Sequence, residues 1–445
     1  MIPSPLNLKK LVRLVLPAAL AIAAGGCAGP SFSYKKSLVQ DIAAQNYTAA
    51  LKKVDESKSK QYGSKNMLLY HLDRGLLLHE AGQYKESDKS FDDAEILYDE
   101  LYTKSLTGAA GTLFINDNTA PYYGKPYDKS LMHVFRALNY AYTGDIQGGL
   151  VEVRKLNLFF RGLRDKNSSG YRDDAFAEYL GGLLYQANGN TDDARISFNA
   201  AADAYKWYQR DYKVSPPPVS TAAACANCGE VIFLHYNGVS PIMVSHTIQV
   251  AWNEAVFAVR ASDSIGKEDS AKFENAIVAG VYTNAITVAL PGFEDIPYAI
   301  KGSEVFVDSQ TYPTVLMEDI GMIEKKLLAQ NLTAITLRAS ARAMLKYVLG
   351  EMISNQVQEN QGDALGLLAK VVTSAAAAGT EVADTRSWVT LPDQLRMARI
   401  QLPPGRHNLH LTFKTADGSS AGDAVLKDIE VTPGQKTFVH YRTAD

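Results

Sequence analysis

The stretch "GLLYQANGNTDDARISFNAA", Gly182–Ala201, decides the predicted fold, because its spacing of small and aromatic residues occurs a second time. The second copy is "GLLLHEAGQYKESDKSFDDA", Gly75–Ala94. The matched pairs are Gly182 with Gly75, Gly189 with Gly82, Ala194 with Ser87, Phe198 with Phe91 and Ala201 with Ala94. Weaker copies occur in "ALNYAYTGDIQGGLVEVRKL", Ala137–Leu156, and in "QNYTAALKKV", Gln45–Val54.

This spacing predicts pairs of antiparallel helices in close contact. Small residues such as Gly182 and Ala194 let the two helices approach, and Gly189 supplies the turn, where a positive φ costs glycine nothing. The two phenylalanines, Phe91 and Phe198, are expected to fill the seam against the next helix pair. The unit resembles the tetratricopeptide repeat of about 34 residues. We therefore expect an all-α, tetratricopeptide-like αα-solenoid over residues 27–213.

An insertion interrupts the repeats. It reads "TGAAGTLFINDNTAPYYGKPYDKSLMH", residues 107–133, and is rich in Asn, Pro, Gly and Tyr. Long insertions in compact helical arrays are often functional. Tyr122, Tyr123 and Tyr127 lie in it, off the helical register, and an exposed group of tyrosines would suit a partner-binding patch. The alternative is a loop that folds back over the helices as packing.

The N-terminal segment has the layout of an export signal. Lys9, Lys10 and Arg13 precede a short apolar run, and small residues then lead to Cys27. The segment resembles a bacterial lipoprotein signal over residues 1–26, with Cys27 as the lipid-bearing mature N-terminus. Ala24 departs from the resemblance, because leucine is more usual there, so cleavage without a lipid stays open.

The residue after Cys27 bears on the location. Ala28, in place of Asp, favours the outer membrane over the inner one by resemblance to the lipoprotein sorting rule. Several acyl chains would hold the protein on the bilayer, since each buried CH₂ contributes about 0.8 kcal/mol. The expected location is therefore the cell outer membrane, lipid-anchored, facing the periplasm.

Residues 214–230 are predicted to be a proline-rich linker. The run Pro216–Pro218 ends the helical pattern, and "AACANCGE" follows it. Cys225 and Cys228 are expected to form a disulfide in an oxidising compartment, or to remain free thiols. Half of a metal site with His235 is a weaker alternative, because no second cysteine pair follows.

The C-terminal half is predicted to contain both helices and strands. In residues 231–385, β-forming residues surround an Asn-Gly turn at Asn237, and a helical pattern runs from Val315 to about Gln358. This segment is expected to be an α+β domain. Residues 386–445 alternate as strands with turns, which predicts a small β-sandwich-like lobe and so a multidomain chain.

The sequence offers no catalytic or metal constellation. It lacks the zincin His-Glu-x-x-His, the Gly-x-Ser-x-Gly elbow, the phosphate-cradling loop and the dinucleotide fingerprint. His407 and His410 are three apart on one strand and so point to opposite faces, which argues against a metal site that they share with His440. The net charge of −3 gives no basic surface for nucleic acid. We expect no cofactor, no metal and no enzymatic activity.

The chain resembles a family of uncharacterised bacterial outer-membrane lipoproteins that contain tetratricopeptide repeats. The segments that carry the resemblance are "ALNYAYTGDIQGGLVEVRKLN", "YNGVSPI", "VALPGF", "RASARAMLK" and "ADTRSWVTLPDQLRMARIQLPPG". The resemblance implies architecture and location, and links some relatives to envelope assembly and peptidoglycan synthesis. In "ADTRSW", Asp384, Arg386 and Trp388 either join the helical middle to the β-lobe or contact a glycan or a partner.

The leading hypothesis is a lipid-anchored periplasmic adaptor that mediates protein–protein contacts in the cell envelope. Its solenoid would present a groove, and its C-terminal half would dock there or to another envelope component. The competing hypothesis is a glycan-binding protein or enzyme with a site around Tyr236–Pro241 and Arg386. A subunit of a pore or secretion channel is a third hypothesis.

Overall fold

The computed structural model describes residues 30–107, 120–165, 171–218, 225, 227–261, 267–278, 280–361 and 382–445. Helices make up the N-terminal half of this part, and they pair as hairpins: α2 with α3, α4 with α5, α6 with α7, and α8 with α9. Their bounds are α2 (Phe32–Ala43), α3 (Tyr47–Glu56), α4 (Met67–Glu80), α5 (Tyr84–Thr107), α6 (Pro126–Tyr142), α7 (Ile146–Asp165), α8 (Ala175–Ala187) and α9 (Thr191–Asp211). Two short helical turns, Lys58–Tyr62 and Ser64–Asn66, connect α3 to α4.

The expected turn glycines are confirmed. Gly82, Gly144 and Gly189 lie between the helices of three hairpins with φ of 72°, 79° and 81°, in the left-handed region that glycine tolerates. In the first hairpin Gln45 takes the corresponding place with φ of 53°. The repeated spacing therefore marks real turns.

The two phenylalanines contact the glycines of their own hairpins. A Cβ atom on Gly75 would lie 2.6 Å from the Phe91 ring, and a Cβ atom on Gly182 would lie 2.6 Å from the Phe198 ring. Each ring thus rests on the glycine of its own hairpin, because only glycine leaves room for it. The expected packing of these rings against the next helix pair stays a prediction.

Strands and three further helices make up the C-terminal half of the described residues. The strands are β1 (Gly229–Asn237), β2 (Ile242–Ala251), β3 (Ala285–Glu294), β4 (Gly302–Val307), β5 (Gln310–Pro313), β6 (Val315–Asp319), β7 (Gln394–Leu402), β8 (Gly405–Lys414), β9 (Ser420–Val431) and β10 (Lys436–Thr443). The helices are α10 (Trp252–Arg260), α11 (Lys267–Val278) and α12 (Ile320–Gln361). The predicted helix from Val315 starts later, at Ile320, because Val315–Asp319 pairs with β7 as a strand.

Two four-stranded sheets form a sandwich, with strand orders β10-β1-β7-β6 and β5-β4-β8-β9. Strand β1 is parallel to β10 and antiparallel to β7. Val231, Phe233 and Ile400 of the first sheet share an apolar core with Val305 and Leu411 of the second. Strand pairing thus joins residues 231–385 to residues 386–445, so the sandwich-like packing extends beyond the expected C-terminal lobe.

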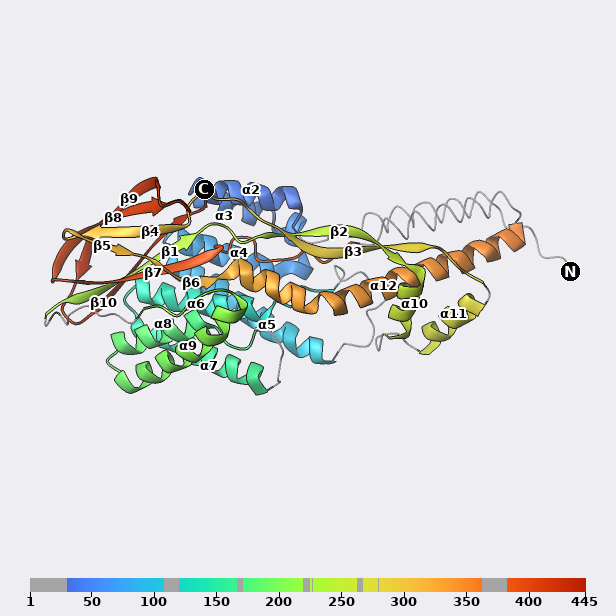
Figure 1. The fold of residues 1–445 in the computed structure, drawn as a ribbon, viewed down its shortest axis with the longest axis horizontal. Coiled ribbons are helices and arrows are strands. Elements are labelled where there is room, and N and C mark those ends of the chain that lie inside the picture. The colour runs from blue at the N-terminus through green and yellow to red at the C-terminus, as the bar shows by residue number, and fades with distance from the viewer. Residues whose placement is uncertain are drawn as a thin grey trace.

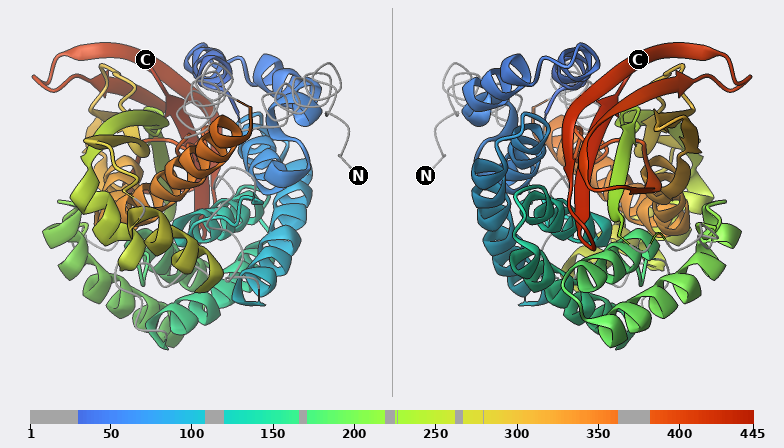
Figure 2. Two further views of the ribbon diagram at one scale, coloured as in Figure 1. Left: turned by 90° about the vertical axis from the view of Figure 1, so that its right-hand side faces the viewer. Right: turned by 90° about the vertical axis from the view of Figure 1, so that its left-hand side faces the viewer.

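The helices curve around the outer face of the first sheet, as both views in Figure 2 show. Ile232, Leu234 and Tyr236 of β1 belong to the same apolar core as the buried faces of the helical hairpins. Trp388 lies in this core, with its ring 6.0 Å from that of Phe91 and 6.1 Å from that of Phe135. The inner side of the helical arc is therefore filled by the chain's own C-terminal half.

An arm projects from this body (Figure 1). It consists of the two-stranded β2–β3 sheet, α10, α11 and the distal part of α12, and it has its own apolar core. Helix α12 begins in the core of the body at Ile320 and contributes Met344 and Val348 to the core of the arm. Within the described residues, no helix combines the length and hydropathy that a membrane crossing requires.

The glycine–phenylalanine contact yields a stability prediction. Gly182→Ala is expected to lower the free energy of unfolding by about 1–3 kcal/mol, because the new methyl group overlaps the Phe198 ring. Gly162→Ala in α7 is the matched control, since no described atom beyond its chain neighbours and the local helix backbone lies within 4 Å of its Cβ position, and it is expected to add about 0.5–1 kcal/mol. Urea unfolding of both variants is the measurement. Equal midpoints would contradict the proposed contact.

Candidate functional site

The three tyrosines of the insertion do not form an exposed patch. Tyr122 and Tyr127 are only 4% and 2% exposed, whereas Tyr123 is 40% exposed. The Tyr122 hydroxyl donates to Asp128 at 2.5 Å, and the Tyr127 hydroxyl donates to Glu324 at 2.8 Å. The prediction of a partner-binding patch is therefore wrong for Tyr122 and Tyr127, whose hydroxyls are bound to buried carboxylates. This part of the insertion packs against the body, as the alternative interpretation expected.

Glu324 ties α12 to two other parts of the chain. Its carboxylate accepts hydrogen bonds from Tyr127 of α6 and from Ser240 after β1. Burial raises the pKa of Glu324 to about 7, against the opposing effect of Lys125 and these hydrogen bonds. The residue thus holds the base of α12 against the helical half.

Arg386 and Trp388 are buried, whereas the Asp384 side chain is 33% exposed. The Arg386 guanidinium is paired with Asp384 through N–O distances of 2.8 and 2.7 Å and donates to the Ala120 carbonyl oxygen at 2.7 Å. The Trp388 indole N–H donates to Thr390 at 2.9 Å. Arg386 is 4% exposed and Trp388 is 1% exposed. These contacts fit the structural interpretation of "ADTRSW", and the burial leaves a glycan no access to either side chain.

The region of the competing hypothesis is also closed. Tyr236, Asn237 and Ser240 are buried, and the Tyr236 hydroxyl lies 2.8 Å from that of Tyr142. The ring of His440 stacks on Tyr236 with centroids 5.0 Å apart. The structure therefore gives no open cleft at Tyr236–Pro241.

His407 and His410 lie apart from the stack of His440 on Tyr236. His407 lies 3.4 Å from Asp308, and His410 pairs with Val425 in the register of β8 and β9. His440 is in the buried stack of aromatic rings, so the three histidines that the sequence raised as a metal group are not brought together.

Cys225 and Cys228 are joined by a disulfide with a Cα–Cα distance of 5.3 Å. The Cys228 carbonyl oxygen accepts from the Gly434 N–H at 3.0 Å, which attaches the end of the linker to the turn before β10. His235 bonds instead to Thr443 and Ser303, so the alternative of a metal site with the cysteines is wrong. Cys27 lies outside the described residues.

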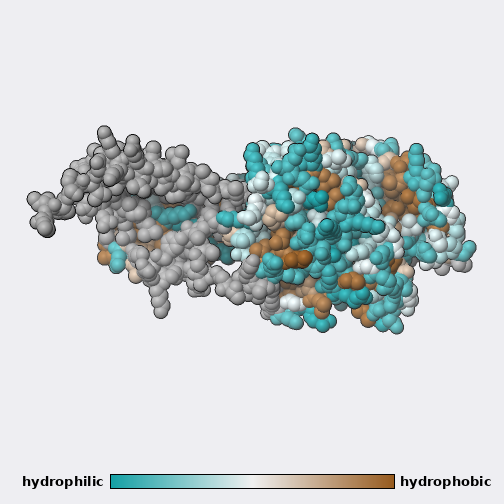
Figure 3. Space-filling model, turned by 180° about the vertical axis from the view of Figure 1, so that it is seen from behind, coloured by the Kyte–Doolittle hydropathy of each residue, from teal (hydrophilic) through white to brown (hydrophobic). Residues whose placement is uncertain are grey.

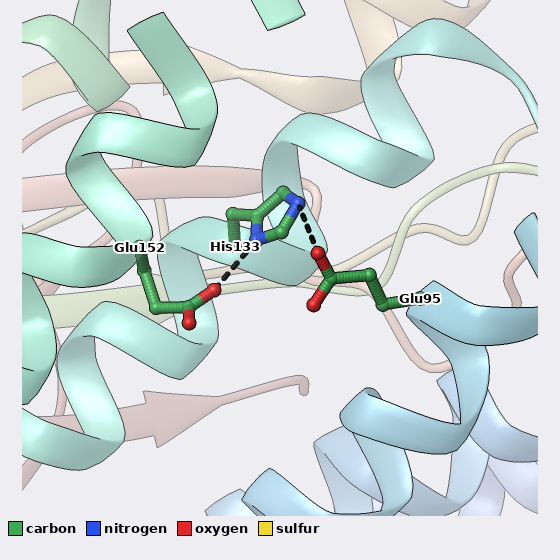
Figure 4. A group of neighbouring side chains, drawn as sticks. All are labelled: Glu95, His133 and Glu152. Atoms are coloured by element: carbon green, nitrogen blue, oxygen red, sulfur yellow. Dashed lines mark hydrogen bonds and ion pairs between the residues drawn. The ribbon is translucent and has the colours of Figure 1, made fainter. Parts of the chain in front are cut away.

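Glu95, His133 and Glu152 form a cluster that no sequence motif indicated (Figure 4). One residue comes from each of α5, α6 and α7, and one candidate ligand atom of each lies within 4.8 Å of the others. His133 Nδ1 is 2.6 Å from a Glu152 oxygen, and Nε2 is 3.9 Å from a Glu95 oxygen. An imidazole and two carboxylates are a donor set that several divalent metals accept.

Two cations already occupy the oxygens of this cluster. Arg136 contacts both glutamates, and Lys155 lies 2.7 Å from Glu95 and 3.3 Å from Glu152. Burial lowers the pKa of His133, although Glu152 and Glu95 oppose this effect. A divalent ion would have to displace Arg136 and Lys155. The arrangement therefore fits an ion-pair network that joins three helices better than a metal centre.

Exposed apolar residues occur on both the arm and the body; on the body, Leu158 of α7 is 65% exposed. On the arm, Phe257 is 65% exposed, Val278 is 87% exposed and Tyr282 is 65% exposed. On the body, Ile96 and Ile196 lie on separate helices, and Figure 3 shows small apolar groups divided by hydrophilic residues on the rear face. Isolated apolar side chains are normal on a protein surface, whereas a concentration of them marks a contact surface.

No protein-family model, curated protein or solved structure matches this chain.

The buried carboxyl of Glu324 yields a pH prediction. Its pKa of about 7 lies above the ordinary 4.5, so the stabilising contribution is complete below pH 4.5 and is lost as the pH rises through 7. Glu324→Gln removes this dependence. Between pH 5 and pH 8 the wild type is expected to lose about 1–3 kcal/mol of unfolding free energy relative to the variant.

Urea unfolding at both pH values is the measurement, and Glu254→Gln on the exposed side of α10 is the control. The interpretation fails if the Glu324 and Glu254 variants follow the same pH profile.

Proposed function

We propose that the protein is a lipid-anchored adaptor of the bacterial outer membrane, facing the periplasm, that holds partner proteins of the cell envelope. Its tetratricopeptide-like hairpins act as the frame for the sheets and the arm. The family resemblance suggests envelope assembly, including peptidoglycan synthesis, as the process that it serves. The export-type segment before Cys27 supports the location.

The exposed apolar residues of the arm are the observation that supports this proposal. Its exposed residues Phe257, Val278 and Tyr282 are large and apolar, and the arm has a core of its own that keeps it folded away from the body. Aromatic residues on a projecting element are the type that proteins use at partner interfaces. The inner side of the helical arc is covered by the first sheet, so partner binding is assigned to the arm and not to a solenoid groove.

The start of the described chain supports an anchor beside the arm. Helix α2 is fixed to the base of β2, because Lys35 Nζ donates to the Met243 carbonyl oxygen at 3.2 Å and to the Thr385 carbonyl oxygen at 2.5 Å. Cys27 precedes Ser31, the N-cap of α2, by four residues, which reach at most about 14 Å. A lipid on Cys27 would thus hold the base of the arm close to the bilayer.

Replacement of the anchor cysteine tests the location. Cys27→Ser is expected to move the protein from the membrane fraction to the soluble periplasmic fraction, because the lipid attachment point is removed. Cys225→Ser is the control, since it leaves the N-terminal segment unchanged and is expected to remain in the membrane fraction. Fractionation of cells with immunoblotting is the measurement. Retention of the Cys27 variant in the membrane would refute the lipid anchor.

Site-specific crosslinking tests the adaptor function. A photoreactive residue at Phe257 or Tyr282 is expected to form discrete adducts in intact cells, whereas one at Ile96 or Ile196 is not. The body positions are matched controls, because they are 54% and 58% exposed. Mass spectrometry of the adducts identifies the partner. Adducts from the body positions alone would count against the arm as the contact surface.

A further inference from the structure

A pocket of about 430 Å³ lies between the C-terminal end of α7, the start of α8 and the second half of α9. It is on the helical half and is separate from every residue considered above. The charged and aromatic residues that line it are Arg164, Arg172, Asp173, Glu178, Asp203 and Trp207. Its volume suits a ligand of side-chain size.

Glu178 is the unusual member of this pocket. The residue is 7% exposed and lies in the first turn of α8, where its backbone N–H donates to the Asp174 carbonyl oxygen at 3.1 Å. Its carboxylate has no hydrogen bond or ion pair with any residue that the structure describes. A buried carboxylate without a partner costs free energy, so such groups are normally paired. Because Glu178 lines the pocket, a ligand in the pocket can contact its carboxylate.

The other charges of the pocket are already engaged. Arg164 is paired with Asp173, and Asp203 lies 2.6 Å from Lys206. The Arg172 guanidinium lies over the Trp207 ring at 5.6 Å from its centroid. Because these groups already have partners, the Glu178 carboxylate is the charge that a ligand would neutralise.

We propose that this pocket binds an organic cation, an ammonium or guanidinium group, with Glu178 as its counter-ion and Trp207 as an apolar wall. The pocket has three carboxylates against two guanidinium groups, which disfavours an anion. A carboxylate beside an aromatic ring is a combination that binds cationic side chains. The cation is either a free amine or a basic side chain of a protein partner. This inference does not depend on the adaptor function.

Binding should depend on pH through Glu178. Burial raises the pKa of Glu178 to about 7, with Asp173 and Asp174 acting in the same direction and Arg164 against it. The other charged groups at the pocket are Arg172 and Asp203. A cation requires the ionised carboxylate, so the affinity is expected to increase about tenfold between pH 6 and pH 8.

Isothermal titration of the full chain with butylammonium, butylguanidinium and Nα-acetyl-lysine methylamide tests the proposal. Glu178→Gln is expected to weaken binding at pH 8 at least tenfold and to abolish the pH dependence. Its fold is checked by its melting temperature. Asp203→Asn, at the same pocket but paired with Lys206, is the matched control and is expected to bind within threefold of the wild type.

The outcomes separate the two sources of the cation. Binding of the two small cations indicates a free amine or guanidine. Binding of the lysine derivative alone indicates a side chain of a protein partner. Either result supports the proposal when Glu178→Gln abolishes the binding. The proposal is overturned if none of the three probes binds, if Glu178→Gln binds them as the wild type does, or if inorganic phosphate binds in their place.

Discussion

Burial of strand β1 on both of its faces is the constraint on which the rest of the structure depends. Every residue of β1 except Glu230 is buried. Because side chains alternate along a strand, Ile232 and Leu234 face the helices while Val231 and Phe233 face the second sheet. A strand of this kind needs a layer on each side. The helical arc supplies one layer and the sandwich supplies the other, so neither half of the chain is complete without the other.

Charged residues fix how these two halves meet. Glu80 at the end of α4 is paired with Arg442 of β10 at 2.9 Å, and both side chains are 1% exposed. Asp73 of α4 accepts hydrogen bonds from Tyr62 and Thr390. Removing one member of a buried pair leaves an uncompensated charge, which is far more costly than losing a surface ion pair. The contacts therefore favour one orientation of the sheet within the arc.

Local features were predictable from the sequence, and distant pairings were not. The spacing of Gly82 and Gly189 located the hairpin turns, because a turn depends on the few residues within it. The burial of Tyr127 could not be inferred, since its partner Glu324 is 197 residues away. Val315 belongs to a strand only because β7 pairs beside it. The spatial neighbours of Glu178 likewise come from α7, α9 and the segment before α8, and they follow no motif.

The parallel pairing of β1 with β10 has a consequence for synthesis. Glu230 and Lys436, which face each other across this pair, are 206 residues apart in the chain. The helical hairpins need only neighbouring residues and can form as soon as they emerge, whereas this sheet closes only when β10 arrives. During that interval the inner side of the arc is uncovered and prone to aggregate. The nascent chain therefore exposes this apolar surface until its final strand is in place.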